Sequence, residues 1–118
     1  MKKANRIKRN EDFQTIFKHG HSTANRQFVI YSYPKKDQAH FRVGLSVSKK
    51  LGDAHLRNYI KRCLRHVMME FDANQLIKHD VDIVIIARNP AATMTYHEMK
   101  SSLEHVLKLA KVYQHRSK

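Results

Sequence analysis

Basic side chains concentrate in the segment from 49 to 65. Only Asp53 is acidic there, against six basic residues, which are Lys49, Lys50, Arg57, Lys61, Arg62 and Arg65. If the second half of this segment is helical, positions 57, 61 and 65 form one stripe at steps of four, with Asn58 and Arg62 beside it. No acidic residue occurs between positions 54 and 69. A solvated helix face normally mixes charges of both signs, so this pattern favours an external polyanion as partner.

The chemistry of these side chains indicates nucleic acid rather than a membrane. Guanidinium groups bind phosphate through paired hydrogen bonds, and Asn both donates and accepts. The chain of 118 residues has a formal net charge of +13. No apolar run approaches the roughly 20 residues that span a bilayer, and no apolar stretch typical of a signal peptide follows the basic N-terminal residues. We therefore expect a cytoplasmic protein with no membrane partner.

Aromatic residues form a second candidate site. Phe13 and Phe17 are four positions apart on an expected helix, and Tyr31 lies on an expected strand. Such rings usually pack in a core. Close to a cationic surface, exposed rings also stack on the unpaired bases of single-stranded RNA. The sequence leaves both interpretations open.

Residues that could support hydrolysis by the protein itself are sparse. Asp80 and Asp82 flank the start of an expected strand. Polar residues are common at such positions, and a metal site is the less favoured interpretation. His19 and His21 lack the further ligands of a zinc site. Cys63 is the only cysteine and falls among apolar helix positions, which favours a buried side chain over a reactive thiol. We expect no catalytic residue and no metal site on the protein alone.

Apolar periodicity predicts the elements that position these side chains. A first helix begins near Asn10 as N-cap and ends at Gly20. Two strands follow, at 28–34 and 41–48. A long helix capped by Asp53 then carries an apolar stripe made of Leu56, Tyr59, Ile60, Cys63, Leu64, Val67, Met68 and Phe71.

The remaining residues predict a buried strand at 81–87 and a last helix that opens with a Thr95–Glu98 capping box. The order α-β-β-α-β-α, with room for one extra short strand, indicates a single α+β domain over 1–118. We expect a two-layer sandwich in which helices cover a small mixed sheet. We expect residues 1–9 and 112–118 to be flexible basic termini.

Three segments resemble the protein component of bacterial ribonuclease P, and the similarity covers nearly the whole chain. The most specific is S-V-S-K-K-L-G-D-A-H-L-R-N-Y-I-K-R at 46–62. The others are R-I-K-R-N-E-D-F-Q-T-I-F-K-H-G at 6–20 and I-I-A-R-N-P-A at 85–91. Two positions depart from the family pattern. Tyr59 stands where the second Arg of R-N-R is usual, and Asp53 stands where Asn is usual.

The resemblance implies an α+β sandwich like the second domain of a small-subunit ribosomal protein, with a left-handed β-α-β crossover that carries the cationic helix. It also implies the function of a ribonuclease P subunit, which binds the catalytic RNA and the 5′ leader of precursor tRNA and assists removal of the leader. Catalysis would belong to the RNA, with magnesium held mainly by RNA and substrate, and the protein alone would be inactive. No protein partner is inferred.

Carried over by position, the residues that face the catalytic RNA are Lys49, Lys50, Arg57, Asn58, Lys61, Arg62 and Arg65, and those that bind the leader are Phe13, Phe17 and Tyr31. Two rival classes stay open on composition alone. One is a structural ribosomal or RNA-assembly protein with no role in cleavage, and the other is a nuclease that acts without RNA. Cleavage assays with and without the catalytic RNA separate these classes.

Overall fold

The computed structural model describes residues 5–36 and 38–114, which form one four-stranded sheet and three α-helices. The strands lie in the order β1 (His21–Ala24), β2 (Phe28–Pro34), β4 (Val81–Ala87) and β3 (Arg42–Val47). β1 with β2 and β2 with β4 are antiparallel, whereas β3 and β4 are parallel. The sheet is therefore mixed, and the β3–α2–β4 connection crosses over between two adjacent parallel strands.

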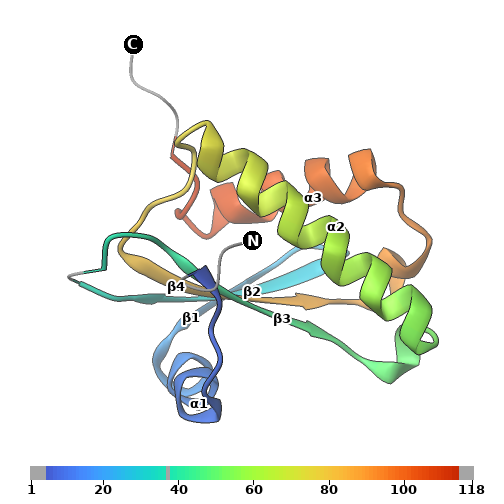
Figure 1. Ribbon diagram of the computed structural model, residues 1–118, viewed down its shortest axis with the longest axis horizontal. Coiled ribbons are helices and arrows are strands. Elements are labelled where there is room, and N and C mark those ends of the chain that lie inside the picture. The colour runs from blue at the N-terminus through green and yellow to red at the C-terminus, as the bar shows by residue number, and fades with distance from the viewer. Residues whose placement is uncertain (1–4, 37, 115–118) are drawn as a thin grey trace.

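Helices cover both faces of this sheet. α2 (Ala54–Ala73) and α3 (Tyr96–Leu109) lie over one face, and α1 (Asn10–His19) lies under the other (Figure 1). Two short 3-10 helices, η2 (Lys49–Leu51) and η3 (Asn89–Thr93), follow β3 and β4. The α+β fold is confirmed, and the sheet with α2 and α3 makes the expected two layers. α1 adds a partial layer on the opposite face.

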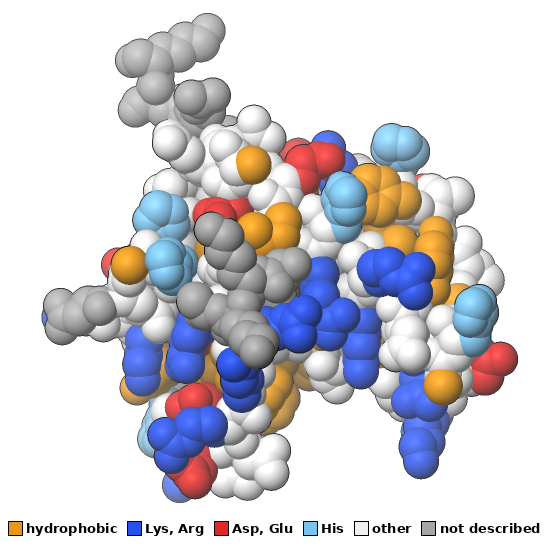
Figure 2. Space-filling view, viewed as in Figure 1, with side chains coloured by type: hydrophobic (Ala, Val, Ile, Leu, Met, Phe, Trp, Pro, Cys, Tyr) orange, Lys and Arg blue, Asp and Glu red, His pale blue; other side chains and the backbone are white. Residues whose placement is uncertain are grey.

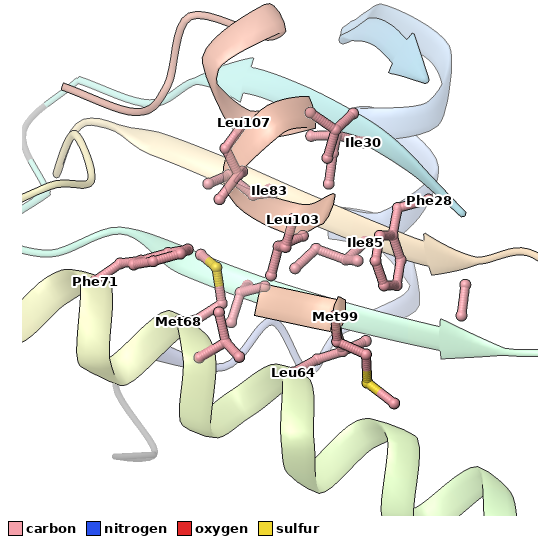
Figure 3. Close-up of a cluster of buried hydrophobic side chains, with 14 of the residues drawn as sticks. Phe28, Ile30, Leu64, Met68, Phe71, Ile83, Ile85, Met99, Leu103 and Leu107 are labelled. Carbon is pink, nitrogen blue, oxygen red and sulfur yellow. The ribbon is translucent and has the colours of Figure 1, made fainter. Parts of the chain in front are cut away.

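The main core fills the space between the sheet and the pair α2 and α3. Alternate residues of β2 and β4 point into it, because successive side chains of a strand face opposite sides. Figure 3 shows these side chains meeting those of the helices; among them are Phe28, Ile30, Leu64, Met68, Phe71, Ile83, Ile85, Met99 and Leu103. Burial of each such side chain contributes about 1.5–3 kcal/mol. This core holds α2 in one orientation, with its polar side outward.

Local sequence signals account for most element boundaries. The bounds of β2 and β4 match the predicted ones, and the short strand β1 is present. The carboxylate of Asp53 accepts the backbone N–H of Leu56 at 2.9 Å and caps α2, while Thr95 and Glu98 form both bonds of a capping box on α3. The Asn10 N-cap is wrong by one residue. Arg9 occupies the N-cap of α1 without a side-chain bond, and Glu11 and Asp12 in the first turn complement the helix dipole.

The terminal segments differ from the expectation of flexibility wherever they are described. Asn5 and Ile7 are buried, and the Asn5 amide donates to the carbonyl of Phe41 at 2.8 Å. Val112 is buried as well, and Lys78 donates its N–H to the carbonyl of Val112 at 3.0 Å. Apolar residues inside these basic stretches thus anchor 5–9 and 112–114, whereas 1–4 and 115–118 lie outside the described residues. Over the described ranges, no helix is both long and apolar enough to cross a membrane.

Candidate nucleic-acid interface

The basic residues of α2 lie on the side that faces away from the main core. Arg57, Lys61 and Arg65 are half-buried, while Asn58 and Arg62 are exposed. With Lys49 and Lys50 of η2, which are also exposed, we call these seven residues the α2 cationic surface. The structure therefore brings all seven predicted RNA-facing residues onto one element and the turn that precedes it.

No acidic side chain of the described residues pairs with a basic side chain of the α2 cationic surface, since the ion pairs found there join other residues. Arg57 Nε is buried and has no hydrogen-bond partner among the described groups. Figure 2 shows Lys and Arg side chains gathered across the middle of the face that α2 occupies, with few Asp or Glu among them. This surface has unneutralised positive charge, which suits a polyanion.

The segment that follows β4 adds one basic and one polar residue, Arg88 and Asn89, to which the sequence pattern assigns no role. Because β3 and β4 are parallel neighbours, their carboxyl ends meet at one edge, and η2 packs against η3. Arg88 and Asn89 are exposed there, near Lys49 and Lys50. Arg88 also donates to the carbonyl of Asn25 at 3.0 Å. The signal that could have found Arg88 is the parallel pairing of two strands that are each followed by basic residues.

Tyr59 lies outside the apolar stripe of α2, although its spacing predicts it there. Its side chain is on the outside of α2, and the residue is 41% exposed. The pKa of Tyr59 is raised, mainly by a hydrogen bond with Cys63, which lies one helical turn further along α2. Tyr59 sits at the border of the stripe, where the amphipathic ring fits either side. Cys63 itself is buried, as predicted.

The aromatic residues predicted to bind the leader meet on the other face of the sheet. The ring of Phe17 stands edge-on to Tyr31, with centroids 5.0 Å apart and planes at 90°, and its centroid lies 6.5 Å from that of Phe13. Phe13 and Tyr31 are half-buried against Ile16 and Val84, whereas Phe17 is 44% exposed. The structure thus brings all three residues together, with one ring presented to solvent.

This aromatic cluster is bordered by sheet residues that α1 does not fully cover. Val29 of β2 pairs with Ile86 of β4, which in turn pairs with Ser46 of β3. Val29 and Ile86 are half-buried and Ser46 is exposed. A partly open strip of sheet therefore lies next to the row that contains Tyr31, and its composition suits the apolar faces of bases.

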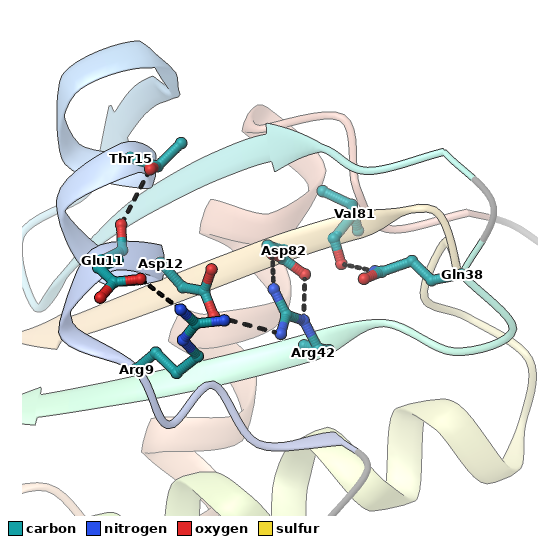
Figure 4. Close-up of polar contacts among 8 residues, drawn as sticks. All are labelled: Arg9, Glu11, Asp12, Thr15, Gln38, Arg42, Val81 and Asp82. Atoms are coloured by element: carbon teal, nitrogen blue, oxygen red, sulfur yellow. Dashed lines mark hydrogen bonds and ion pairs between the residues drawn. The ribbon is translucent and has the colours of Figure 1, made fainter.

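An ion-pair network fixes α1 to the sheet. Arg42 of β3 donates from Nε to Asp82 Oδ1 at 3.0 Å and from Nη2 to Oδ2 at 2.5 Å, and its Nη1 lies 3.5 Å from Asp12 Oδ2 of α1 (Figure 4). The bond to Asp82 is the main cause that raises the pKa of Arg42. Asp82 is only 2% exposed, so the buried carboxylate is neutralised by Arg42. Asp82 therefore has a structural role, which agrees with its interpretation as a polar residue at the entrance of a strand.

Metal binding by the protein has no support in the described residues. No group of three or more His, Cys, Asp or Glu side chains converges there in a way that could hold an ion. Asp80 directly precedes β4 and Asp82 lies within it, and the Asp82 carboxylate forms an ion pair with Arg42. His19 and His21 are exposed and belong to no such group.

The two surfaces lie on opposite sides of the sheet, which separates the α2 cationic surface from the aromatic cluster beside α1 (Figure 1). A small α+β domain with an unpaired cationic helix on one face and an aromatic cluster with one exposed ring on the other belongs to the class of RNA-binding proteins. A family model described as Ribonuclease P matches residues 1–111, and the chain belongs to the ribonuclease P protein family.

Known proteins of this family are similar over nearly their full length. A relative named Ribonuclease P protein component, from Staphylococcus epidermidis, is 57% identical over 113 residues, which cover 96% of each chain. The solved structure of the Staphylococcus aureus RNase P protein has a TM-score of 0.85 and 54% identity, and covers 95% of this chain and 100% of that one.

A second structure of the S. aureus protein, described as a mutant with defective mRNA degradation activity, has a TM-score of 0.84 and 55% identity, covering 93% of this chain and 91% of that one. The family assignment makes the chain a ribonuclease P subunit, which partners with the RNA subunit of that ribonucleoprotein and takes part in tRNA processing.

Proposed function

We propose that the chain binds two RNA molecules at once, the catalytic RNA through the α2 cationic surface and the 5′ leader of precursor tRNA through the aromatic cluster of Phe13, Phe17 and Tyr31. The observation that carries this proposal is the exposed ring of Phe17, which stands edge-on to Tyr31, next to a partly open strip of sheet. The exposed part of this ring makes no packing contact, and it offers a stacking surface to an unpaired base.

The position of this cluster supports a single-stranded ligand. The sheet and α1 border a strip that is apolar at Val29 and Ile86, and duplex RNA cannot offer base faces to it. The cationic surface on the opposite face suits a folded RNA, which presents phosphates. Each surface therefore matches a different state of RNA.

The proposal assigns cleavage to the catalytic RNA and leaves the protein alone inactive on precursor tRNA. The protein's share is to hold the leader near the RNA and to reduce repulsion between phosphates, for which its net charge of +13 is suited. Magnesium, held mainly by RNA and substrate, would supply the activated water. The described residues offer no acidic cluster that fits this ion, which supports assigning it to the RNA.

The test is cleavage of precursor tRNA by the protein alone, by the catalytic RNA alone, and by both together at limiting magnesium. We expect leader removal only when the RNA is present, and faster removal when the protein is added. Leader removal by the protein without RNA would overturn the assignment of chemistry to RNA. Removal that is unaffected by the protein would favour a structural RNA-binding role.

A separate arm addresses the activity named for the S. aureus mutant. The protein alone is incubated with an unstructured mRNA fragment under the same conditions. The described residues carry no cluster of carboxylates for hydrolysis, so we expect the fragment to remain intact. An activity that degrades the fragment and co-purifies with the protein would show that the protein itself hydrolyses RNA.

A further inference from the structure

A hollow of about 300 Å³ lies at the end of the sheet that is remote from η2 and η3. Its lining comes from the start of β1, the end of β2, the segment 78–81 and the turn 110–112 that follows α3. The hollow is at the start of β4, whereas Lys49 and Lys50 follow the end of the parallel strand β3, so about 20 Å of strand separates them. A hollow of this size is at the lower end of the range that binds small molecules.

The strand register determines which side chains form the sheet side of this hollow. Ser32 of β2 pairs with His21 of β1, and Pro34 of β2 pairs with Val81 of β4. Alternate residues of a strand face the same side, so Ser32 and Pro34 lie on the face of β2 that α3 covers. These four residues line the hollow together with Tyr33.

The hydroxyl of Ser32 is a buried polar group without a partner. Ser32 is only 7% exposed, and its Oγ forms no hydrogen bond with any residue that the structure describes. Buried polar groups are normally paired, and each exception calls for an explanation. Because Ser32 lines the hollow, a molecule that enters it can supply the missing partner. A hydroxyl both donates and accepts, so either kind of group can serve.

The turn that follows α3 holds Lys111 in an unfavourable backbone conformation. Its φ of 63° lies in the left-handed region, where the residue after a helix end is usually Gly. The turn is fixed, because Lys111 donates its N–H to the carbonyl of Lys108 at 3.1 Å and the carbonyl of Val112 accepts the N–H of Lys78 at 3.0 Å. Lys111 therefore carries its ammonium group at the hollow from a fixed backbone position, where Gly would fold with less strain.

The interior of the hollow and its rim differ in chemistry. Ser32, Val81 and Val112 are buried inside it, so the interior is apolar apart from one hydroxyl. The exposed charged or titratable residues of the rim are His21, Lys78, Asp80 and Lys111. Neither lysine forms an ion pair within the described ranges. A matching ligand has a compact, mainly apolar body with a polar edge, and it ends in a negative charge.

We propose that this hollow binds one nucleotide, with its base inside against Ser32 and its phosphate at Lys78 and Lys111. The site goes beyond the proposed function, because it uses neither the α2 cationic surface nor the aromatic cluster. A base has apolar faces and a hydrogen-bonding edge, which match the two buried valines and the hydroxyl. Histidine rings stack on bases, and His21 lies beside Ser32 on the neighbouring strand. An alkyl chain would leave the hydroxyl unpaired.

Binding of single nucleotides to the full chain tests the site. Calorimetric titration at fixed ionic strength gives the dissociation constants of the four nucleoside 5′-monophosphates and of ribose 5-phosphate. The last carries the same phosphate without a base, so it measures attraction to basic surfaces in general. We expect the best nucleotide to bind at least about tenfold more tightly than ribose 5-phosphate, since stacking of one base contributes a gain of that order. Equal affinity of all five compounds would overturn the inference.

Ser32→Ala separates binding from folding. Because the hydroxyl has no partner, its removal should leave the midpoint of thermal unfolding unchanged or raise it. Affinity for the best nucleotide should fall about fivefold, and affinity for ribose 5-phosphate should not change. Ser101→Ala is the matched control, since Ser101 is exposed on α3 and does not line the hollow. Nucleotide binding by Ser32→Ala that equals that of the control would overturn the inference.

Lys111→Ala and Lys111→Gly both remove the ammonium group, and only Gly relieves the left-handed conformation. Both should weaken nucleotide binding about fivefold, because a charge-assisted hydrogen bond is lost. The Gly variant should have the higher unfolding midpoint of the two. Lys18→Ala removes the same charge from α1, on the other face of the sheet. If it weakens binding as much as Lys111→Ala, only net charge attracts the nucleotide and the inference fails.

A free nucleotide and one unit of a single-stranded RNA share this chemistry, and a trinucleotide distinguishes them. Tighter binding of the trinucleotide than of the best mononucleotide, with the same dependence on Ser32, would identify the occupant as a unit of an RNA strand. Binding that is no tighter would identify a free nucleotide. The site stands in both cases. Leader removal enters none of these measurements, so they are independent of the proposed function.

Discussion

The ring of Phe13 on α1 occupies the space above Gly44 of β3 that a side chain would fill. A Cβ atom at position 44 would lie 2.4 Å from Cε1 and 2.6 Å from Cζ of that ring. Gly44 pairs with Val84 of β4, which is buried under the same helix. The glycine thus lets α1 approach the sheet closely, and this approach sets the position of Phe17 relative to Tyr31.

Gly44→Ala is expected to lower the free energy of unfolding by about 1–3 kcal/mol, because the Phe13 ring must move or α1 must lift. Affinity for precursor tRNA should also fall, since Phe17 moves with α1. Urea unfolding and equilibrium binding measure the two effects. In the double variant with Phe13→Ala, the loss of stability should be smaller than the sum of the single losses. Additive losses would show that the two residues do not clash.

Asp82→Ala is expected to cost about 3–5 kcal/mol of stability, because it leaves Arg42 without its buried partner. Asp12→Ala removes the longer and more exposed contact to the same guanidinium, and we expect a cost below about 1 kcal/mol. Denaturant unfolding of both variants gives the comparison. Similar costs for the two would mean that burial of the Arg42–Asp82 pair does not make it the more important of the two contacts for stability.

Arg57→Ala and Arg62→Ala should each weaken binding to the catalytic RNA and leave the fold intact, because neither side chain enters the main core. Each lost phosphate contact should flatten the plot of log affinity against log salt by about one unit. Lys108→Ala is the control, since Lys108 lies on α3 and pairs with Glu104. If the salt slopes of the arginine variants match that of the control, the α2 cationic surface is only solvated.

Replacing a buried Phe with Ala typically lowers the free energy of unfolding by about 3–5 kcal/mol. Phe17→Ala should lower it by less, because 44% of the residue is already exposed. Affinity for precursor tRNA should fall by about 1–3 kcal/mol, and affinity for leaderless tRNA should not change. Tyr31→Ala should show the same preference, since its ring contacts Phe17.

Phe28→Ala is the matched control for this prediction, because Phe28 is fully buried in the main core. That variant should lose stability without losing the preference for leader-bearing tRNA. The prediction would be contradicted if Phe17→Ala had a much lower melting temperature and kept its preference for leader-bearing over leaderless tRNA. Phe17 would then serve only in packing.

Tyr59→Arg should steepen the salt dependence of binding to the catalytic RNA by about one unit, because it adds a cation to the α2 cationic surface. Tyr59→Ala should weaken binding and leave the slope unchanged, because a ring contributes stacking and no charge. Tyr59→Phe keeps the ring and loses the bond to Cys63, so it should bind like the unaltered chain. Equal affinity of Tyr59→Ala and the unaltered chain would exclude a role for the ring.

Local patterns in the sequence were sufficient for the helices, most strands and the α2 cationic surface. Arg57, Lys61 and Arg65 share one side of α2 because their spacing equals a helical turn, and this relation is independent of the rest of the fold. Capping by Asp53 and by Thr95 is equally local, since each side chain bonds a backbone group three residues on. Tyr59 was misplaced because a ring at the border of an apolar stripe satisfies either environment.

Strand order and register decided the contacts between distant residues. Arg42 meets Asp82 because β3 pairs with β4 in parallel, and Phe17 meets Tyr31 because α1 packs under β2. Ser32 and Lys111 line one hollow because α3 packs over β2 and β1. Periodicity reports which side of an element is apolar, but it carries no information on which other element covers that side. The free energy of the whole packed core selects among those pairings, so only the tertiary structure could reveal them.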